Sequence, residues 1–127
     1  MKFARNVFLI AGVYGILVLT PLYFLEARIG RETPPAITHP EYFYGFIGVA
    51  LVFQIVFLII ATDPQRYRPI VIPCVLEKVS YPVALIALMA QGRLYTSTLV
   101  VGSIDWIFAF LFVAALAKTP HPSSDKV

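Results

Sequence analysis

Residues Ile70–Ala90 read IVIPCVLEKVSYPVALIALMA, which places two adjacent charges, Glu77 and Lys78, inside an otherwise apolar segment. At about 1.5 Å of rise per residue, an α-helix of this length crosses the roughly 30 Å hydrocarbon core of a bilayer. A charged side chain in the middle of such a helix costs at least about 2.5–3.5 kcal/mol unless it finds a partner. We therefore expect a membrane span whose charges are held by neighbouring helices.

The composition of the whole chain is typical of a membrane protein. Of its 127 residues, 59% are hydrophobic and 13% are charged, and the mean hydropathy is +0.81. In soluble domains roughly 45–50% of the residues are apolar and roughly 25% are charged. A small soluble domain also has too little interior to bury this much apolar surface. The net charge of +3 is small and dispersed along the chain. That pattern excludes the basic patch of a nucleic-acid-binding protein.

Residues used in metal and covalent chemistry are scarce. Cys74 is the single cysteine, so no disulfide can form within the chain, and we expect it to be a small buried group rather than a reactive thiol. The two histidines, His39 and His121, lie outside the apolar segments. No glycine-rich phosphate loop, nucleophile elbow or HExxH motif is present. We expect no metal site, and the sequence identifies no cofactor.

Four apolar segments are long enough to span a bilayer, which predicts an all-α fold, a four-transmembrane-helix antiparallel bundle in a single membrane domain covering residues 1–127. The expected helices cover residues 7–25, 42–61, 70–90 and 99–117. Thr20-Pro21 should kink or fray the end of the first helix, and the polar tail 119–127 should be disordered. The first segment exceeds the roughly 7–15 apolar residues of a signal peptide, so we expect it to be retained.

The connections between these segments carry local signals. Residues 26–40 contain a glycine and three prolines, which predicts a loop. Thr38 and Glu41 match a capping box at the start of the second helix. Asp63 followed by Pro64 is typical of an N-cap with proline at the first helical position.

Small residues indicate where helices approach one another closely. Gly12 and Gly15 lie on one face of the first span. Gly102 and Ala109 flank Asp105 on one face of the fourth. Such faces let helix backbones pack tightly in a membrane.

Positive charges predict the orientation. With four spans both termini lie on one side, and the basic residues of that side are Lys2, Arg5, Arg66, Arg68, Lys118 and Lys126. The other side carries Arg28, Arg31 and Arg93. The positive-inside rule therefore predicts that both termini are cytoplasmic.

The charged stretch of the third span forms one stripe. On a helix, Cys74, Glu77, Lys78, Tyr81 and Leu85 share one face, which should turn toward the bundle. Counting about 1.5 Å per residue, Glu77 and Lys78 lie roughly 10–12 Å from the cytoplasmic edge. These polar groups should therefore meet polar groups of similar depth on the other helices.

Two such groups are present. Gln54 on the second span lies at about the same depth as Lys78, and Asp105 on the fourth lies roughly 18 Å from the cytoplasmic edge. A lysine side chain covers most of that difference, so we expect Lys78 to pair with Asp105 or Glu77. Pro82 adds a free backbone acceptor, because it lacks the amide that would bond the Lys78 carbonyl.

These residues form the candidate site. The expected ligand-binding residues are Gln54, Glu77, Lys78, Tyr81, Asp105 and Trp106. Glu77 and Asp105 are also the candidates for a catalytic role. A purely structural polar cluster is the competing interpretation, although such interactions contribute only about 0.6 kcal/mol on average in membranes.

A third interpretation makes Arg66–Lys78 an interfacial helix, which would leave Glu77 in water. Tyr81–Ala90 alone is too short to span, which argues against it. His39 and Glu41 lie at the expected outer mouth, where capping and a solvated loop are the simpler interpretation.

The chain resembles a group of small, uncharacterised bacterial four-helix integral membrane proteins. The resemblance lies in His39–Gln54 (HPEYFYGFIGVALVFQ), Asp63–Pro69 (DPQRYRP), Val75–Tyr81 (VLEKVSY), Gln91-Gly-Arg93 and Asp105-Trp106. It covers nearly the whole chain and implies the bacterial cytoplasmic (inner) membrane, but no activity. In architecture the chain also resembles DoxX-like proteins and the EXPERA sterol-isomerase group, whose motifs do not match here residue by residue.

Three functions remain open. We favour a non-catalytic protein whose inter-helix pocket binds a lipophilic molecule, a lipid or a quinone, or which docks a larger membrane complex as an accessory subunit. The alternative is a membrane enzyme, an isomerase or a quinone-linked redox accessory, in which Glu77 or Asp105 shuttles a proton. Transport of protons or small solutes is third, because one four-helix chain has a narrow interior unless it forms a homo-oligomer.

Overall fold

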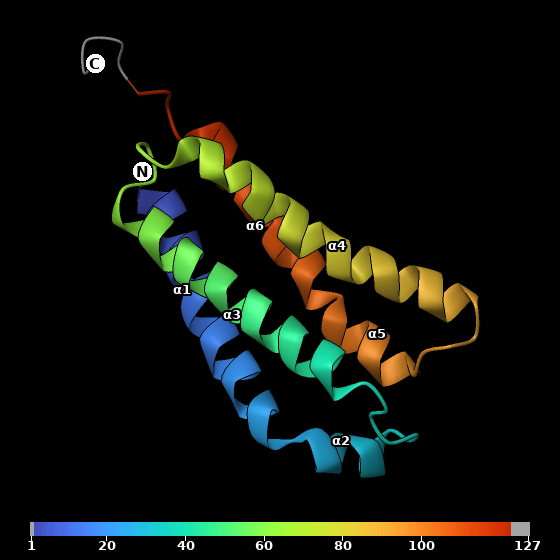
Figure 1. Ribbon diagram of the computed structural model, residues 1–127. Coiled ribbons are helices and arrows are strands. Elements are labelled where there is room, and N and C mark those ends of the chain that lie inside the picture. The colour runs from blue at the N-terminus through green and yellow to red at the C-terminus, as the bar shows by residue number, and fades with distance from the viewer. Residues whose placement is uncertain (1, 123–127) are drawn as a thin grey trace.

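The computed structural model describes residues 2–122, in which four helical spans are long and apolar enough to cross a membrane (Figure 1). These spans are Lys2–Phe24, Pro40–Thr62, Arg68–Ala90 and Thr96–Lys118. Each contains 23 residues, enough at about 1.5 Å per residue for the roughly 30 Å of hydrocarbon. The spans run up and down, and both ends of the described chain lie at the same end of the bundle. The expected all-α antiparallel bundle is confirmed.

The first span consists of α1 (Lys2–Leu19) and a 3₁₀ segment, η1 (Thr20–Phe24). The helix starts before the expected Val7, because the buried face already begins at Ala4. The α-helix ends where the sequence predicted a disturbance. Pro21 lies in the first turn of η1, and proline has no amide to continue an α-helical ladder.

A short helix, α2 (Glu26–Glu32), occupies the first half of the segment that was expected to be a loop. That expectation is wrong for these residues. Arg28 Nε donates to Glu32 Oε1 at 3.0 Å, an i,i+4 ion pair that supports one face of the helix. Thr33 then ends it, with its hydroxyl donating to the Ile29 carbonyl at 2.8 Å. The helix forms although it contains Gly30, a residue with low helix propensity, and the Arg28–Glu32 ion pair supports it.

The second span is α3 (Pro40–Thr62), and its N-cap residue is His39. The expected capping box between Thr38 and Glu41 is wrong, because the N-cap makes no side-chain hydrogen bond to the helix. Pro40 at the first turn explains the start instead, since its fixed φ angle suits a helix and its missing amide is not needed there. Glu41 lies 3.2 Å from His39 Nδ1.

The turn after α3 follows the expected pattern. The Asp63 carboxylate accepts from the Arg66 backbone amide at 3.2 Å, as expected of a capping residue, but residues 64–67 form a turn and the next helix begins only at Arg68. A 3₁₀ turn, η2 (Arg68–Ile70), leads into α4 (Val71–Ala90). The helix α4 continues through Lys78 and Pro82 to its end, so the interfacial-helix interpretation of Arg66–Lys78 is wrong.

The fourth span is divided into α5 (Thr96–Gly102) and α6 (Ile104–Lys118). The break falls at Ser103, whose hydroxyl donates to the Leu99 carbonyl at 2.6 Å. Serine hydroxyls that bond the carbonyl four residues back tend to bend helices. The span begins at Thr96, before the expected residue 99, and its break at Ser103 lies two residues before Asp105.

The start of the polar tail is held against the bundle. Arg68 Nε donates to the Thr119 carbonyl and Gln65 Nε2 to the His121 carbonyl, each at 3.0 Å. Thr119 is buried, so the expected disorder is wrong at residues 119–121. Residues 123–127 of the predicted tail, which include Lys126, lie outside the described residues.

An aromatic core fills the end of the bundle where the termini meet. It consists of Phe8 from α1, Phe57 from α3, and Phe108 and Phe112 from α6. Phe8 and Phe112 stack at 4.4 Å between ring centroids, and Phe57 meets Phe112 edge-on at 4.9 Å. Such pairs add about 0.5–1.5 kcal/mol beyond their burial. This end of the molecule is closely packed.

The bundle consists of two helix pairs that diverge from this core. The helix α1 packs along α3, and α4 packs along α5 and α6, whereas α3 and α4 make little contact (Figure 1). Glycines set both close approaches, as the sequence predicted. A Cβ atom at Gly12 would lie 2.8 Å from Leu58 Cγ, and one at Gly102 would collide with Leu85.

Candidate functional site

A cavity of about 590 Å³ lies between the two diverging helix pairs. Small-molecule sites range over roughly 300–1,000 Å³, so the volume suits a small ligand. Most of the wall is apolar and comes from all four spans and α2. The sequence-predicted residues that line the cavity are Gln54, Glu77, Lys78, Tyr81 and Asp105. The structure therefore brings together five of the six expected ligand-binding residues.

Trp106 is the exception. It lines neither this cavity nor the neighbouring groove, and 37% of its surface is exposed. Adjacent residues on an α-helix point about 100° apart, so a helix that turns Asp105 inward turns Trp106 aside. The pocket-lining role expected for Trp106 is not seen.

Lys78 lies at the floor of the cavity and is only 5% exposed. Its Nζ atom is 3.8 Å from Glu77 Oε2 and 3.7 Å from Asp105 Oδ1. The expected pairing of Lys78 is confirmed, and it involves both carboxylates rather than one. Both distances exceed the usual 2.7–3.2 Å of an N–H···O hydrogen bond, so these are ion pairs without a direct hydrogen bond.

The aromatic core forms the other side of this lysine. Nζ lies 5.1 Å from the ring centroid of Phe57 and 5.4 Å from that of Phe108. A cation over an aromatic face gains about 0.5–2 kcal/mol, with the larger values for desolvated sites. The core thus supports the buried cation from below, and the two carboxylates hold it from the cavity side.

Gln54 contributes an unused hydrogen-bond acceptor. The side chain is 1% exposed, and its Nε2 atom donates to the Ala50 carbonyl at 2.8 Å. Because a carbonyl only accepts, the amide nitrogen must face Ala50, which fixes the amide orientation. The remaining oxygen, Oε1, has no hydrogen-bond partner in the described chain. It points at Gly15, whose missing side chain leaves room for it.

Buried acceptors of this kind are rare, because an unsatisfied buried polar group costs about 1–3 kcal/mol. Glu77 Oε2 is a second buried oxygen without a hydrogen bond within residues 2–122. Both atoms belong to residues that line the cavity. The polar floor therefore has hydrogen-bonding capacity that its own side chains leave unused.

The buried face of α4 differs slightly from the predicted stripe. Its centre runs through Cys74, Lys78, Pro82 and Leu85, and Cys74 is fully buried as expected. Pro82 was expected to act through the amide it lacks, yet its ring is itself buried in this face. Its i+4 spacing from Lys78 was the signal that could have placed it there. Glu77 lies at the edge of the face, toward α3.

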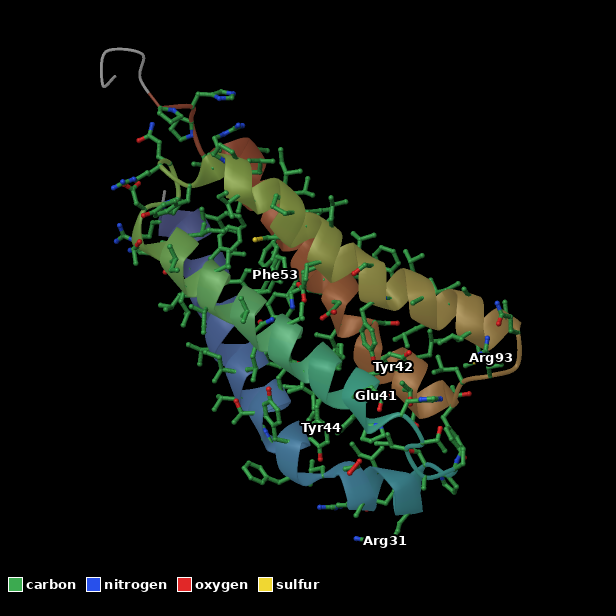
Figure 2. The ribbon with its side chains drawn as sticks, in the orientation of Figure 1. Arg31, Glu41, Tyr42, Tyr44, Phe53 and Arg93 are labelled. Carbon is green, nitrogen blue, oxygen red and sulfur yellow. The ribbon has the colours of Figure 1, made fainter. Side chains whose placement is uncertain are left out.

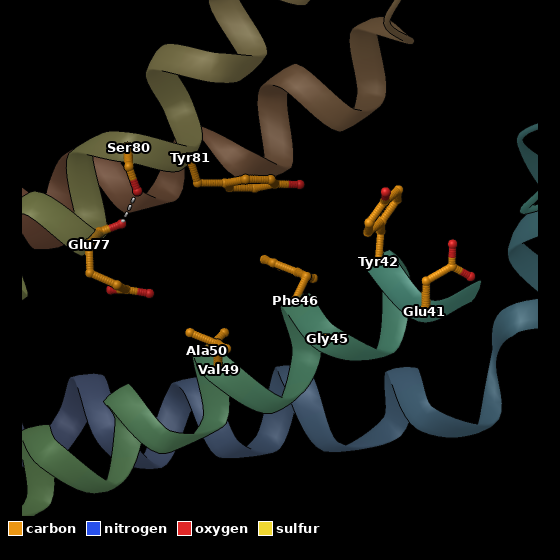
Figure 3. Close-up of a pocket in the computed structure, with 9 residues that line it drawn as sticks. All are labelled: Glu41, Tyr42, Gly45, Phe46, Val49, Ala50, Glu77, Ser80 and Tyr81. Atoms are coloured by element: carbon orange, nitrogen blue, oxygen red, sulfur yellow. Dashed lines mark hydrogen bonds between the residues drawn. The ribbon is translucent and has the colours of Figure 1, made fainter. Parts of the chain in front are cut away.

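A groove of about 500 Å³ between α3 and α4 adjoins the cavity. Figure 3 shows Glu77 and Tyr81 of α4 facing Phe46 and Ala50 of α3 across this groove. These four residues also line the cavity. The rings of Phe46 and Tyr81 stack at 5.6 Å between centroids. They form a partition between the cavity and the outer surface of the bundle.

Sequence reasoning missed Phe46. It belongs to the aromatic cluster at the start of the second span, which is typical of an interfacial belt. The four-residue spacing from Phe46 to Ala50 and again to Gln54 was the available signal, because it puts all three on one helix face.

The far end of the cavity is covered by α2 and its flanking loops. Figure 2 places Arg31 and Arg93 at this end, opposite the termini. The Tyr95 hydroxyl donates to the Pro34 carbonyl at 2.6 Å, which joins the loop before α5 to the loop before α3. The Tyr44 hydroxyl lies 3.5 Å from Glu26 Oε2, linking α3 to α2. The Tyr95 bond bridges the two helix pairs, and the Tyr44 contact holds α2 against α3.

Within residues 2–122, no group of three or more histidine, cysteine, aspartate or glutamate side chains could hold a metal ion. Glu41 lines the mouth of the groove beside the exposed His39.

No family model, curated protein or solved structure matches the chain. The resemblances to small bacterial four-helix proteins, DoxX-like proteins and the EXPERA group therefore stay predictions.

Proposed function

We propose that this small membrane protein binds a lipophilic molecule with a polar head in the cavity between its helix pairs, and that binding rather than catalysis is its activity. The observation that carries the proposal is the polar floor of an otherwise apolar cavity. There, the buried Gln54 Oε1 has no hydrogen-bond donor among the described residues. A polar head supplies donors at the floor, and the rest of the ligand contacts the apolar wall.

A purely structural ion cluster explains this arrangement less well. Interhelical polar contacts contribute only about 0.6 kcal/mol on average in membranes, which is small beside the desolvation of three charges. A structural cluster also gains most when its groups bond one another directly. Here the two ion pairs are 3.7 and 3.8 Å long, and they adjoin a cavity rather than close packing.

The ligand enters from the bilayer. The groove lies where α3 and α4 make little contact, and the stacked Phe46 and Tyr81 line both the groove and the cavity. Rotation of either ring joins the groove to the cavity. A lipophilic molecule can then move sideways from the lipid without crossing water.

The proposed location is the cytoplasmic membrane of a bacterium, with both termini in the cytoplasm. The basic residues of the end that carries the termini support this orientation. The aromatic core then lies in the inner half of the bilayer, and the cavity opens in the outer half.

Proton-transfer catalysis is the second candidate, and one observation favours it. Glu77 and Asp105 line the same cavity and share one ammonium group, so a proton taken up by one carboxylate can be returned by the other. An isomerase would use such a pair on a lipophilic substrate. Isomerase activity that is unchanged in both Glu77→Gln and Asp105→Asn excludes proton-transfer catalysis by these carboxylates.

Photolabelling of the full chain in lipid nanodiscs tests the binding proposal. The probes are alkyl diazirines with neutral, cationic or anionic heads, and labelled peptides are identified by mass spectrometry. At least one probe should label α4 and α5 saturably. Val101→Trp, which narrows the cavity, should reduce the labelling about tenfold, whereas Val100→Trp should not, because Val100 is similarly exposed but lies outside the cavity lining. Labelling that is unsaturable, or equal in the two variants, overturns the proposal.

A further inference from the structure

The charges that line the cavity do not balance. Glu77 and Asp105 contribute two carboxylates, and Lys78 contributes the one ammonium group, which leaves a formal charge of −1. The remaining ionisable lining residues are tyrosines, which are neutral near pH 7. At the mouth of the adjoining groove, Glu41 adds a further acid. A single negative charge in excess is unfavourable in a site shielded from water.

Lys78 already forms ion pairs with both of these carboxylates. It is shared between Glu77 and Asp105, and it rests on the rings of Phe57 and Phe108. A cation so enclosed cannot neutralise both acids by moving toward one of them, because it would leave the other behind. The balance must come from a second cation or from a proton.

Gln54 gives an independent indication of the same chemistry. Its unused oxygen accepts hydrogen bonds and cannot donate them. The other buried lining atom without a hydrogen bond among the described residues, Glu77 Oε2, is an acceptor as well. A head group that carries only acceptors, such as a carbonyl or a carboxylate, leaves Gln54 unsatisfied. A head group with N–H donors satisfies it.

We propose that the cavity selects amphiphiles whose head is a protonated primary amine. The ammonium group supplies the missing positive charge and donates to Gln54 Oε1 and to the carboxylates of Glu77 and Asp105. The hydrocarbon part lies against the apolar wall and extends toward the groove. This inference rests on the proposed binding function and names its ligand class.

Four probes with one alkyl diazirine chain test the preference on the full chain in zwitterionic nanodiscs. Their heads are a primary ammonium, a trimethylammonium with charge but no donors, a hydroxyl with a donor but no charge, and a carboxylate. The signal lost in Val101→Trp defines binding in the cavity. We expect the ammonium probe to bind about tenfold or more tightly than the hydroxyl probe, because charge-assisted hydrogen bonds are the stronger class. The carboxylate probe should bind weakest.

Variants that change the charge sharpen the test. Glu77→Gln makes the formal charge zero and should remove the advantage of ammonium over hydroxyl. Glu77→Gln combined with Asp105→Asn leaves Lys78 as the sole charge and should reverse the order, so that the carboxylate probe binds best. Gln54→Leu should weaken the ammonium and hydroxyl probes but spare trimethylammonium. Thermal unfolding in the same nanodiscs identifies any variant that fails to fold.

The outcomes separate the two proposals. Equal binding of ammonium and hydroxyl probes to the wild type overturns the amine inference and leaves the binding function standing, since it means that one carboxylate carries a proton. An order of head groups unchanged by Glu77→Gln overturns the inference as well. If no probe labels the cavity saturably, the binding function itself is wrong.

Discussion

The buried ammonium group of Lys78 is stabilised by the side chains around it. Burial disfavours its charge, while two carboxylates and two aromatic faces favour it. Removing the ammonium leaves two acids facing each other in a shielded site. Breaking a buried ion pair in this way costs about 3–5 kcal/mol, much more than the net contribution of an intact pair. We therefore expect Lys78 to be needed mainly because Glu77 and Asp105 are charged, and less for its packing in the fold.

Lys78→Met should destabilise the protein by about 3 kcal/mol, because Glu77 and Asp105 lose their common partner. The measurement is the free energy of unfolding in mixed detergent micelles. The matched control is the triple variant Lys78→Met, Glu77→Gln, Asp105→Asn, which removes all three charges together. It should recover most of the loss. A triple variant as unstable as the single one would show that packing, not charge, sets the effect.

Replacement of Gly12 and of Gly45 by alanine should change the stability of the bundle in opposite directions. Gly12 faces the close contact with α3, where an added Cβ meets Leu58 and the Gln54 backbone, so Gly12→Ala should cost about 1–3 kcal/mol. Gly45 in α3 has open space around it, so Gly45→Ala should stabilise the helix by about 0.5–1 kcal/mol. Thermal unfolding of both variants checks the signs. Equal shifts of the same sign contradict the packing of α1 on α3.

For individual residues, most of the site could be predicted from the depth of each side chain along its helix and from the spacing of residues in the sequence. The fixed rise of a helix puts Gln54, Lys78 and Asp105 at heights that a long side chain can bridge. Rotation about each helix axis is set by neighbours rather than by local sequence, so two positions were misplaced. Phe46 was not expected at the pocket, and Trp106 was expected there.

At the scale of elements, the decisive feature is the divergence of the two helix pairs. Aromatic packing closes one end, and at the other end α2 and two loops cover the opening (Figure 1). Sequence reasoning could not foresee α2, because its glycine and the following prolines predict a loop. Gly30 is explained by a close approach, since an added Cβ would lie 3.1 Å from Ala36 Cα. A tertiary contact of this kind leaves no periodic trace in the sequence.

The bond from Tyr95 to the Pro34 carbonyl should stabilise this cover. Tyr95→Phe removes a bond of 2.6 Å, and a hydrogen bond contributes about 0.5–1.5 kcal/mol. Backbone amides of residues 33–39 should therefore exchange with solvent several-fold faster, as measured by hydrogen exchange with mass spectrometry. Tyr42→Phe is the control, because Tyr42 lies exposed at the same end. Unchanged exchange in Tyr95→Phe means that the loops are held by other contacts.

At the scale of the whole molecule, hydropathy and charge act together. The four candidate spans within residues 2–122 have equal length, so the loops that join them lie at the two ends of the bundle. The start of α1, which is Lys2, and the turn between α3 and η2, which contains Arg66, lie at the end that carries the termini (Figure 1). Arg31 and Arg93 lie at the other end (Figure 2). One of the basic residues at the first end is also structural, since Arg68 bonds the Thr119 carbonyl after α6. The charge bias and the packing therefore cannot be separated by mutating Arg68.

Single cysteines resolve the orientation without disturbing those charges. In a Cys74→Ala background, which removes the buried native thiol, Thr38→Cys and Thr62→Cys place exposed thiols at opposite ends of α3. With both termini in the cytoplasm, a membrane-impermeant maleimide should label Thr38→Cys in intact bacterial cells. Thr62→Cys should react only after lysis. The reverse pattern contradicts the proposed orientation, and it would also move the cavity into the inner half of the bilayer, where its ligand would have to come from the cytoplasmic leaflet.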